Sequence, residues 1–320
     1  MTISDTKNQI SSLAKLLPVL VGALSLGAIL SACSGGNGDS GSTNGTVTPP
    51  IRVVAAENFW GSIASQLGGA KVDVRAIITS PDTDPHDYEA TAGDARLLAG
   101  ANYVIFNGVG YDPWVDKALD ANPASGRLKL KVQSVLGLKN DDNPHRWYSP
   151  KDVQKIIDQI TSDYKKLDPA DAAYFDAQKS TFLNSSLKAY LDLVQEIKQK
   201  YADTPVGATE SIVSPLTDAL GLKMLTPSGF LTAISEGTDP TAKDKATFDS
   251  QIKNKQVKVV LFNSQNSTPD VRQLVDAAGG QGIEVVEVTE TLDPPAATFQ
   301  AWQVAQLENL AAALAKATGR

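Results

Sequence analysis

The sequence contains two histidines, and both lie in an unusual local context. His86 lies in residues 84–89 (DPHDYE), and His145 lies in residues 143–150 (NPHRWYSP). Each histidine directly follows a proline, which restricts the preceding backbone. A neutral imidazole is a common metal ligand, and two in matching loops can share one ion. A lone histidine is more often a structural residue, so it is the pairing that favours a shared metal site.

The single cysteine, Cys33, is the other residue with distinctive chemistry. It follows a leader that carries Lys7 and Lys15, an apolar run at residues 16–30 and the small residues Ser-Ala. This pattern is typical of a secretory signal, and the run is shorter than the ~20 residues of a membrane-spanning helix. Leu-Ser-Ala-Cys resembles a bacterial lipobox. We therefore expect a lipoprotein signal peptide at residues 1–32 and lipidation of Cys33; the alternative is an exported protein with a free thiol.

Charge and cysteine content exclude several classes of function. The formal net charge is −7 for the whole chain, and it becomes −8 without the leader, which carries two lysines and one aspartate. An acidic chain without a basic face is not expected to bind nucleic acid. One cysteine allows no disulfide within the chain and no metal site built on several sulfurs.

The elements that must position the histidines alternate between strand and helix. Residues 33–50 are rich in Gly, Ser, Thr and Asn and read as a flexible tether. The alternation that follows predicts βα units and a mainly parallel sheet. The expected strands are 51–56, 72–78 and 103–107, and the expected helices are 58–67, 92–98 and 112–119.

A long helical stretch divides the chain. Residues 150–166 are predicted to form one helix. Residues 169–201 are expected to form a second helix, about 50 Å long if it is continuous, with the Asn-Ser-Ser cluster at 184–186 as its weakest point. The strand–helix alternation then restarts, with expected strands at 206–209, 257–263 and 283–288 and helices at 212–220, 248–252, 271–278 and 299–317.

These patterns predict an α/β fold of two lobes with mainly parallel sheets joined by a long helix. The predicted lobes are residues 51–168 and 204–320, and the connecting helix is 169–203. No sequence repeat relates the two lobes.

Three segments resemble motifs of one known family. Residues 85–91 (PHDYEAT) are similar to its Pro-His-x-Tyr-Glu motif, residues 106–114 (FNGVGYDPW) to its Asn-Gly segment, and residues 144–150 (PHRWYSP) to its His-x-Trp-x-x-Pro motif. The three motifs occur in this order before the predicted long helix. From residue 51 onward the chain therefore resembles the cluster A-I receptors of ABC importers, the zinc/manganese group.

The resemblance implies one metal ion held between the lobes, with two ligands from each lobe. His86 and His145 take the first two positions. The third ligand follows the first strand of the second lobe and is Glu210 here. The fourth follows the last strand and is Glu290, where the family usually has an aspartate. Glu287 and Asp293 are alternatives for this fourth position.

Such a ligand set is chemically coherent. Two neutral imidazoles and two carboxylates cancel the charge of a dication, so a buried site keeps no net charge. Mixed nitrogen and oxygen ligands suit zinc and also manganese. At equilibrium the site should favour zinc, because manganese lies lowest in the Irving–Williams order. The sequence leaves the choice between the two metals open.

The function implied is that of an extracytoplasmic, lipid-anchored, monomeric receptor and not of an enzyme. It would capture Zn²⁺ or Mn²⁺ and deliver the ion to an ABC permease and its ATPase. One alternative is an exported metal-dependent hydrolase, in which zinc keeps an open position for water; the sequence has neither an HExxH nor a GxSxG motif. Another alternative is a cell-adhesion protein with the same fold.

Overall fold

The computed structural model describes residues 49–81 and 83–320 of this chain. The predicted signal peptide, Cys33 and the tether up to residue 48 lie outside the described residues. In the part of the chain that the structure describes, no helix is both long enough and apolar enough to cross a membrane.

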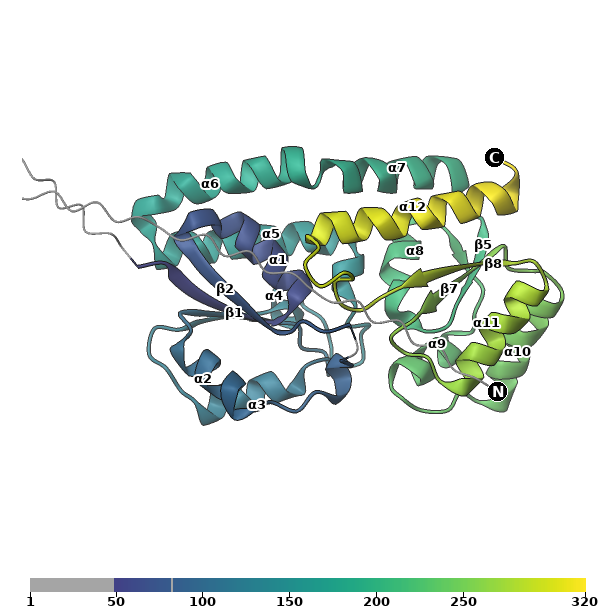
Figure 1. The fold of residues 1–320 in the computed structure, drawn as a ribbon, viewed down its shortest axis with the longest axis horizontal. Helices are drawn as coiled ribbons and strands as arrows, with labels where there is room; N and C mark the ends of the chain where they lie inside the picture. The colour runs from purple at the N-terminus through teal and green to yellow at the C-terminus, as the bar shows by residue number, and fades with distance from the viewer. Residues whose placement is uncertain (1–48, 82) are drawn as a thin grey trace, which may run out of the picture. The chain divides into compact units, whose positions relative to one another are not determined.

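The first lobe is built on a parallel sheet with the strand order β2-β1-β3-β4 (Figure 1). Its strands are β1 (Ile51–Glu57), β2 (Val72–Ile78), β3 (Tyr103–Phe106) and β4 (Leu128–Lys131). Its helices are α1 (Asn58–Gly68), α2 (Ala92–Gly100), α3 (Pro113–Ala121) and α4 (Val132–Leu136). Strand β3 (YVIF) is buried at every position, as expected for a parallel strand covered on both faces.

The second lobe repeats this topology with the strand order β6-β5-β7-β8. Its strands are β5 (Pro205–Ala208), β6 (Lys223–Met224), β7 (Val259–Asn263) and β8 (Glu284–Val288). Its helices are α8 (Ser214–Leu220), α9 (Ser228–Ser235), α10 (Ala242–Lys253), α11 (Pro269–Gly280) and α12 (Phe299–Thr318). The predicted α/β fold of two lobes with parallel sheets is confirmed.

Four short elements were not anticipated from the sequence: β4, α4, β6 and α9. β4 (LKLK) and β6 (two residues) are edge strands, which pair on one side only. A short, half-exposed edge strand needs little apolar sequence, so it leaves a weak signal.

The connection between the lobes is helical but not uniform. After α5 (Pro150–Leu167), a 3₁₀ turn leads into α6 (Ala172–Thr181), a π-helical turn covers Phe182–Ser186, and α7 (Lys188–Tyr201) completes the stretch. The amide of Leu187 donates to the carbonyl of Phe182 over 2.8 Å, five residues back. The π turn contains the Asn-Ser-Ser cluster, whose side chains compete with the helical backbone for hydrogen bonds.

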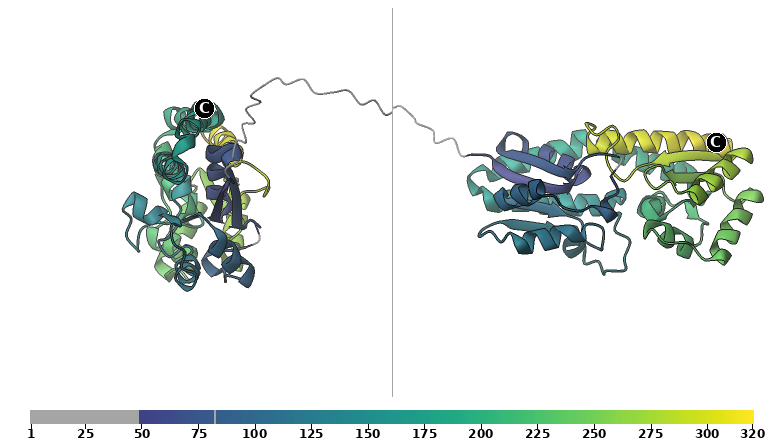
Figure 2. Two further views of the ribbon diagram at one scale, coloured as in Figure 1. Left: turned by 90° about the vertical axis from the view of Figure 1, so that its left-hand side faces the viewer. Right: turned by 60° about the horizontal axis from the view of Figure 1, so that its bottom comes forward.

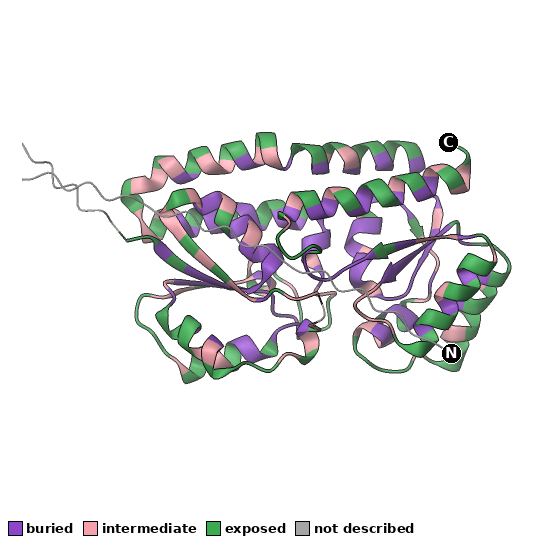
Figure 3. Cartoon of the chain, viewed as in Figure 1, coloured by how far each residue is buried: buried purple, intermediate pink, exposed green. Residues whose placement is uncertain are grey.

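One hydrophobic core runs through both lobes. It includes Val53 and Phe59 from the first lobe, Val206 and Leu261 from the second, and Leu310 from α12. Helices α6, α7 and α12 lie along the same side of both sheets (Figures 1 and 2). The inner strands β1, β3, β5 and β7 are largely buried, whereas the outer faces of α6 and α7 are exposed (Figure 3). Separating the lobes would expose this shared apolar layer to water, which opposes large movements.

Capping residues define where the helices that follow the two histidine loops begin. Thr91 and Asp94 form a reciprocal capping box at the start of α2, which follows the His86 loop. Ser149 caps α5 and Pro150 occupies its first turn, directly after the His145 loop. Each loop is therefore bounded by a helix with a defined first residue.

Candidate metal centre

Three of the four predicted ligands converge at one point. One ligand atom each from His86, His145 and Glu290 lies within 4.8 Å of the other two. His86 lies on the 3₁₀ turn Pro85–Asp87 after β2, His145 directly precedes the 3₁₀ turn Arg146–Tyr148, and Glu290 follows β8. Glu290 thus comes from the second lobe and the histidines from the first.

Strand topology explains why the junction of the lobes collects polar groups. In each sheet the first strand has the second strand on one side and the third on the other, so the strand order changes direction between β1 and β3 and between β5 and β7. The carboxyl ends of strands at such a switch point form a crevice. Asn107 and Asn263 lie at the ends of β3 and β7, and Glu57 and Glu210 lie at the ends of β1 and β5. All four side chains are buried.

The ring of His145 is oriented for metal binding. Its Nδ1 lies 2.9 Å from Oδ1 of Asn143, and an amide oxygen only accepts, so Nδ1 carries the proton. The opposite nitrogen, Nε2, then carries a free lone pair, and it is buried with no hydrogen-bond partner within residues 49–81 and 83–320. Asn143 also donates from Nδ2 to the carbonyl of Ser211 over 2.7 Å, next to Glu210. An outer hydrogen bond of this kind fixes the tautomer of a metal-binding histidine.

His86 presents a second free nitrogen. Its Nε2 is buried, and no described residue offers it a hydrogen bond. Its ring lies 4.6 Å from the ring of Tyr111 and 5.9 Å from that of His145, centroid to centroid. The backbone amide of His86 donates to Oδ1 of Asp84 over 2.9 Å. That bond fixes the conformation of the turn, and therefore the backbone position from which the His86 side chain extends.

Glu290 is held by donors from both lobes. Tyr111 Oη donates to its Oε2 over 2.8 Å, and Asn263 Nδ2 donates to its Oε1 over 3.0 Å. The side chain is 4% exposed. The two alternatives for this position, Glu287 and Asp293, are both exposed. The structure therefore favours Glu290 over either of them.

Glu210 lies beside this group but outside it. Its Oε1 accepts from Asn263 Nδ2 over 2.7 Å and its Oε2 accepts from Asn266 Nδ2 over 2.7 Å. The amide of Asn263 therefore bridges Glu210 and Glu290. Each Glu210 oxygen thus accepts one asparagine donor and keeps a second lone pair that could bind an ion.

Burial sets the charge state of the centre. Burial lowers the pKa of His145 well below its usual value, with the neighbouring His86 acting in the same direction. Burial also lowers the pKa of His86, against the opposing charges of Asp84, Asp87 and Glu236. Both imidazoles are therefore neutral at pH 7, the form that binds metal.

The two carboxyl groups respond in the opposite direction. Burial, and then the charge of Glu210, raises the pKa of Glu290 well above its usual value. Burial raises the pKa of Glu210 to about 7, although the two asparagine donors partly oppose it. Without a cation, the site is therefore most stable with protons on its carboxyl groups.

A polar cavity leads from the surface to this centre. It has a volume of 290 Å³ and is lined by residues of both lobes, with His86 among them. Its wall carries Asp141, Asp142 and Glu236 and no lysine or arginine. An acidic, polar passage favours the entry of a cation over that of an anion.

Comparison with known proteins agrees with this geometry. Residues 53–313 match the family described as zinc-uptake complex component A, periplasmic. The chain belongs to this family.

Two curated relatives illustrate the range of the zinc-uptake family. The high-affinity zinc uptake system protein ZnuA of Bacillus subtilis (strain 168) is 22% identical over 290 residues, which cover 83% of this chain and 85% of that protein. The manganese-binding lipoprotein MntA of Halalkalibacterium halodurans is 23% identical over 152 residues, which cover 47% of this chain and 48% of that protein. This chain thus spans about half the length of some curated relatives that it matches.

The fold is also that of solved structures. The periplasmic zinc binding protein TroA from Treponema pallidum superposes with a TM-score of 0.68 at 19% sequence identity. The superposition covers 83% of this chain and 99% of that one. At this identity the likeness concerns the fold alone.

Three residues that orient the proposed metal ligands were not identified from the sequence: Tyr111, Asn143 and Asn263. Tyr111 lies in the Asn-Gly segment and Asn143 two residues before His145. Asn263 is the last residue of β7, where a polar side chain ends an apolar strand. That position at a strand end was the available signal, because ligand sites in parallel sheets form there.

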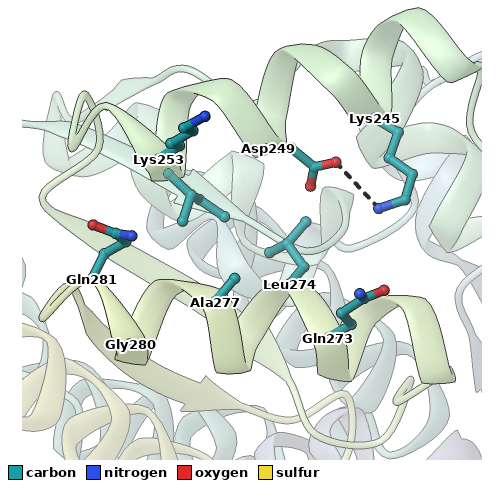
Figure 4. Close-up of a pocket in the computed structure, with 9 residues that line it drawn as sticks. Lys245, Asp249, Lys253, Gln273, Leu274, Ala277, Gly280 and Gln281 are labelled. Atoms are coloured by element: carbon teal, nitrogen blue, oxygen red, sulfur yellow. Dashed lines mark hydrogen bonds and ion pairs between the residues drawn. The ribbon is translucent and has the colours of Figure 1, made fainter.

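A larger cavity lies elsewhere, on the surface of the second lobe between α10 and α11 (Figure 4). Its volume is 440 Å³, and its walls include Lys253, Gln273, Gln281 and the ion pair between Lys245 and Asp249, 3.4 Å apart. No histidine or cysteine lines it. Its side chains offer no metal-binding set comparable to the one at the junction of the lobes.

Proposed function

We propose that this chain is an extracytoplasmic substrate-binding receptor that captures Zn²⁺ or Mn²⁺ and delivers the ion to an ABC importer. The supporting observation is the pair of free, buried Nε2 atoms of His86 and His145 beside the carboxylate of Glu290. Two neutral nitrogens and a carboxylate in one buried cluster are a ligand set that suits a dication. Membership of the zinc-uptake family supports the same role.

The proposed ligands are His86, His145, Glu290 and Glu210. The first three need only small adjustments, because their ligand atoms already lie within 4.8 Å of one another. Glu210 completes the set when its carboxylate moves toward the ion, because it lies beside the cluster of the other three and each of its oxygens keeps a lone pair. The resulting two imidazoles and two carboxylates neutralise a dication in a buried site.

The same ligand set bears on the choice of metal. Nitrogen and oxygen ligands accept both zinc and manganese, and zinc binds more tightly to a given site of this kind. The relatives named above are a zinc uptake protein and a manganese-binding lipoprotein. We propose that zinc is bound preferentially at equilibrium and that manganese is loaded where its supply exceeds that of zinc.

Elemental analysis and titration test this function. Protein stripped of metal should bind one Zn²⁺ or one Mn²⁺ per chain, and zinc should displace manganese in a competition titration. Two equivalent ions per chain, or no binding of either metal, would contradict the proposal. Hydrolytic activity that depends on the bound metal would favour the exported hydrolase instead. Binding to host or matrix proteins without metal uptake by cells would favour the adhesin.

We also propose that lipid on Cys33 holds this receptor, as a monomer, at the membrane, where it meets a permease and its ATPase. Cys33→Ala should leave the protein unprocessed or release it from the membrane fraction, because no other thiol can accept the lipid. Intact-mass measurement of the membrane fraction checks this. Mature protein with an unmodified Cys33 in that fraction would rule out lipidation.

A further inference from the structure

Glu57 is a buried acid for which the metal site gives no explanation. It is the last residue of β1, its side chain is 0% exposed, and neither carboxylate oxygen accepts a hydrogen bond from another of the described residues. An ionised carboxylate buried without a donor is strongly unfavourable, and such a group takes up a proton instead. The surroundings of Glu57 therefore call for a protonated side chain.

Asp112 supplies the acceptor for that proton. Asp112 lies beside the end of β1, because β1 pairs with β3 and the amide of Asn107, directly after β3, donates to Asp112. Each of the two carboxyl groups affects the pKa of the other. The two oxygens of Asp112 already accept from the backbone amides of Asn107 (2.6 Å) and Gly108 (2.7 Å). Two N–H donors stabilise the ionised form of Asp112. In the pair, Asp112 is therefore the anion and Glu57 the acid.

We propose that Glu57 and Asp112 form a buried acid pair in which Glu57 keeps a proton at neutral pH, and that this pair positions the loop beside the cargo site. The proton on Glu57 is donated to Asp112, and Asp112 holds the backbone after β3. The positioning part of this inference rests on the function proposed above, whereas the protonation of Glu57 does not.

The loop held by Asp112 has a backbone that needs support. Gly108, Val109 and Gly110 have φ values of 79°, 57° and 76° in succession. A left-handed conformation is unfavourable for a β-branched residue such as Val109 and persists only where its surroundings enforce it. A Cβ at Gly108 would lie 2.6 Å from Lys131 Cε. The two bonds to Asp112 begin this loop, and a bond from the Val109 amide to Gln133 Oε1 (3.1 Å) continues it.

The loop connects the acid pair to the predicted ligands on two sides. Tyr111, at its end, donates to Glu290 and lies against the ring of His86. Asn107, at its start, donates from Nδ2 to the carbonyl of Pro144 over 2.9 Å, directly before His145. A shift of this loop would therefore displace groups around three of the four proposed ligands.

The charges facing the pair agree with this placement of the proton. Burial, and then the charge of Asp112, raises the pKa of Glu57 well above 4.5, and Glu290 adds to the effect. Burial raises the pKa of Asp112 to about 6, the charge of Asp116 adds to it, and the amides of Asn107 and Gly108 oppose it. Asp112 therefore ionises first, and Glu57 is the group of the pair that keeps its proton.

Glu57→Gln tests the protonation directly, because its amide keeps a donor but cannot titrate. Infrared spectra at neutral pH should show the carbonyl stretch of a protonated carboxylic acid in the wild type, and part of this band should be missing in the variant. Metal-loaded protein is the best sample, since bound ligands are ionised. Identical spectra in this region would overturn the proposal.

Unfolding free energies provide a second readout. Because folding raises the pKa of Glu57, its contribution to stability is fully present below the unfolded value near 4.5 and declines as pH rises toward the folded value. Because glutamine does not titrate, the stability of Glu57→Gln should not decline in this way. The stability of the variant relative to the wild type should therefore increase from pH 5 to pH 7.5 in urea denaturation, by up to about tenfold in the folding equilibrium constant per pH unit. A pH-independent difference would contradict a protonated Glu57.

Measurements of metal affinity distinguish a positioning role of the acid pair from a purely structural one. Glu57→Gln should bind metal nearly as well as the wild type, because the donor to Asp112 is kept. Asp112→Asn should weaken binding about 10–100-fold, as expected when the support of a ligand is lost. Asp116→Asn, on the same helix but half exposed, is the matched control and should have no effect. Equal affinities for all three variants would refute the positioning role.

If no form of the protein binds metal, the proposed function fails, and the infrared and stability results still decide the protonation of Glu57.

Discussion

Replacing His145 with alanine should lower the affinity for Zn²⁺ or Mn²⁺ by more than ~100-fold, which exceeds the usual ~10–100-fold cost of losing an outer partner of a ligand. His145 is fully buried, its tautomer is set by Asn143, and its Nε2 has no partner among the residues that the structure describes. The change removes a ligand that needs no reorientation, and no neighbouring side chain can replace it. Competition titration against a metal-binding fluorescent dye measures the loss.

Two matched variants define what this result means. Asn143→Ala leaves the imidazole in place but removes the acceptor for Nδ1, so it should cause a smaller loss than His145→Ala. Glu287→Gln changes an exposed acid on β8 and should leave affinity unchanged. Wild-type affinity in His145→Ala would exclude the proposed centre, provided that the variant retains its unfolding transition.

The affinity for the cargo ion should rise steeply with pH between about pH 6 and about pH 8. The pKa of Glu290 is raised well above its usual value and that of Glu210 is raised to about 7. Below its folded pKa each carboxyl group carries a proton that the ion must displace. Each displaced proton makes the binding constant rise about tenfold per pH unit, until pH exceeds that pKa.

The histidines should contribute little to this slope. Burial lowers the pKa of both His86 and His145, so each is already neutral above its usual value of 6.5. Their protonation weakens binding only at lower pH. The carboxyl groups therefore govern the dependence near neutral pH, and the histidines govern the acid limit.

Calorimetry in buffers with different ionisation enthalpies counts the protons released at each pH. Glu290→Gln should lower affinity and reduce the number of protons released near pH 7 by up to one. Glu287→Gln should leave both quantities unchanged. Binding that releases no protons at pH 7 and has the same affinity at about pH 6 and about pH 8 would contradict the charge states described here.

Local sequence was sufficient to predict most of the framework. The buried strand β3, the half-buried strand β2 and the helices α5 and α12 follow from apolar periodicity and from caps such as Ser149 with Pro150, which act over a few residues. The two Pro-His loops were recognisable for the same reason. The short edge strands β4 and β6 were missed because little of their surface is buried, so no apolar pattern marks them.

Only the tertiary structure decided how the polar groups are arranged. Sequence proposed Glu210 as the third ligand and Glu290, with Glu287 and Asp293 as alternatives, as the fourth. It could not place Glu290 beside the histidines and Glu210 between two asparagines. That difference depends on Tyr111, which reaches Glu290 across 179 positions, and on Asn263, which bridges both acids. The proton on Glu57 likewise depends on its burial next to Asp112. Hydrogen bonds and desolvation depend on distances between groups far apart in the chain, and only the packed core sets those distances.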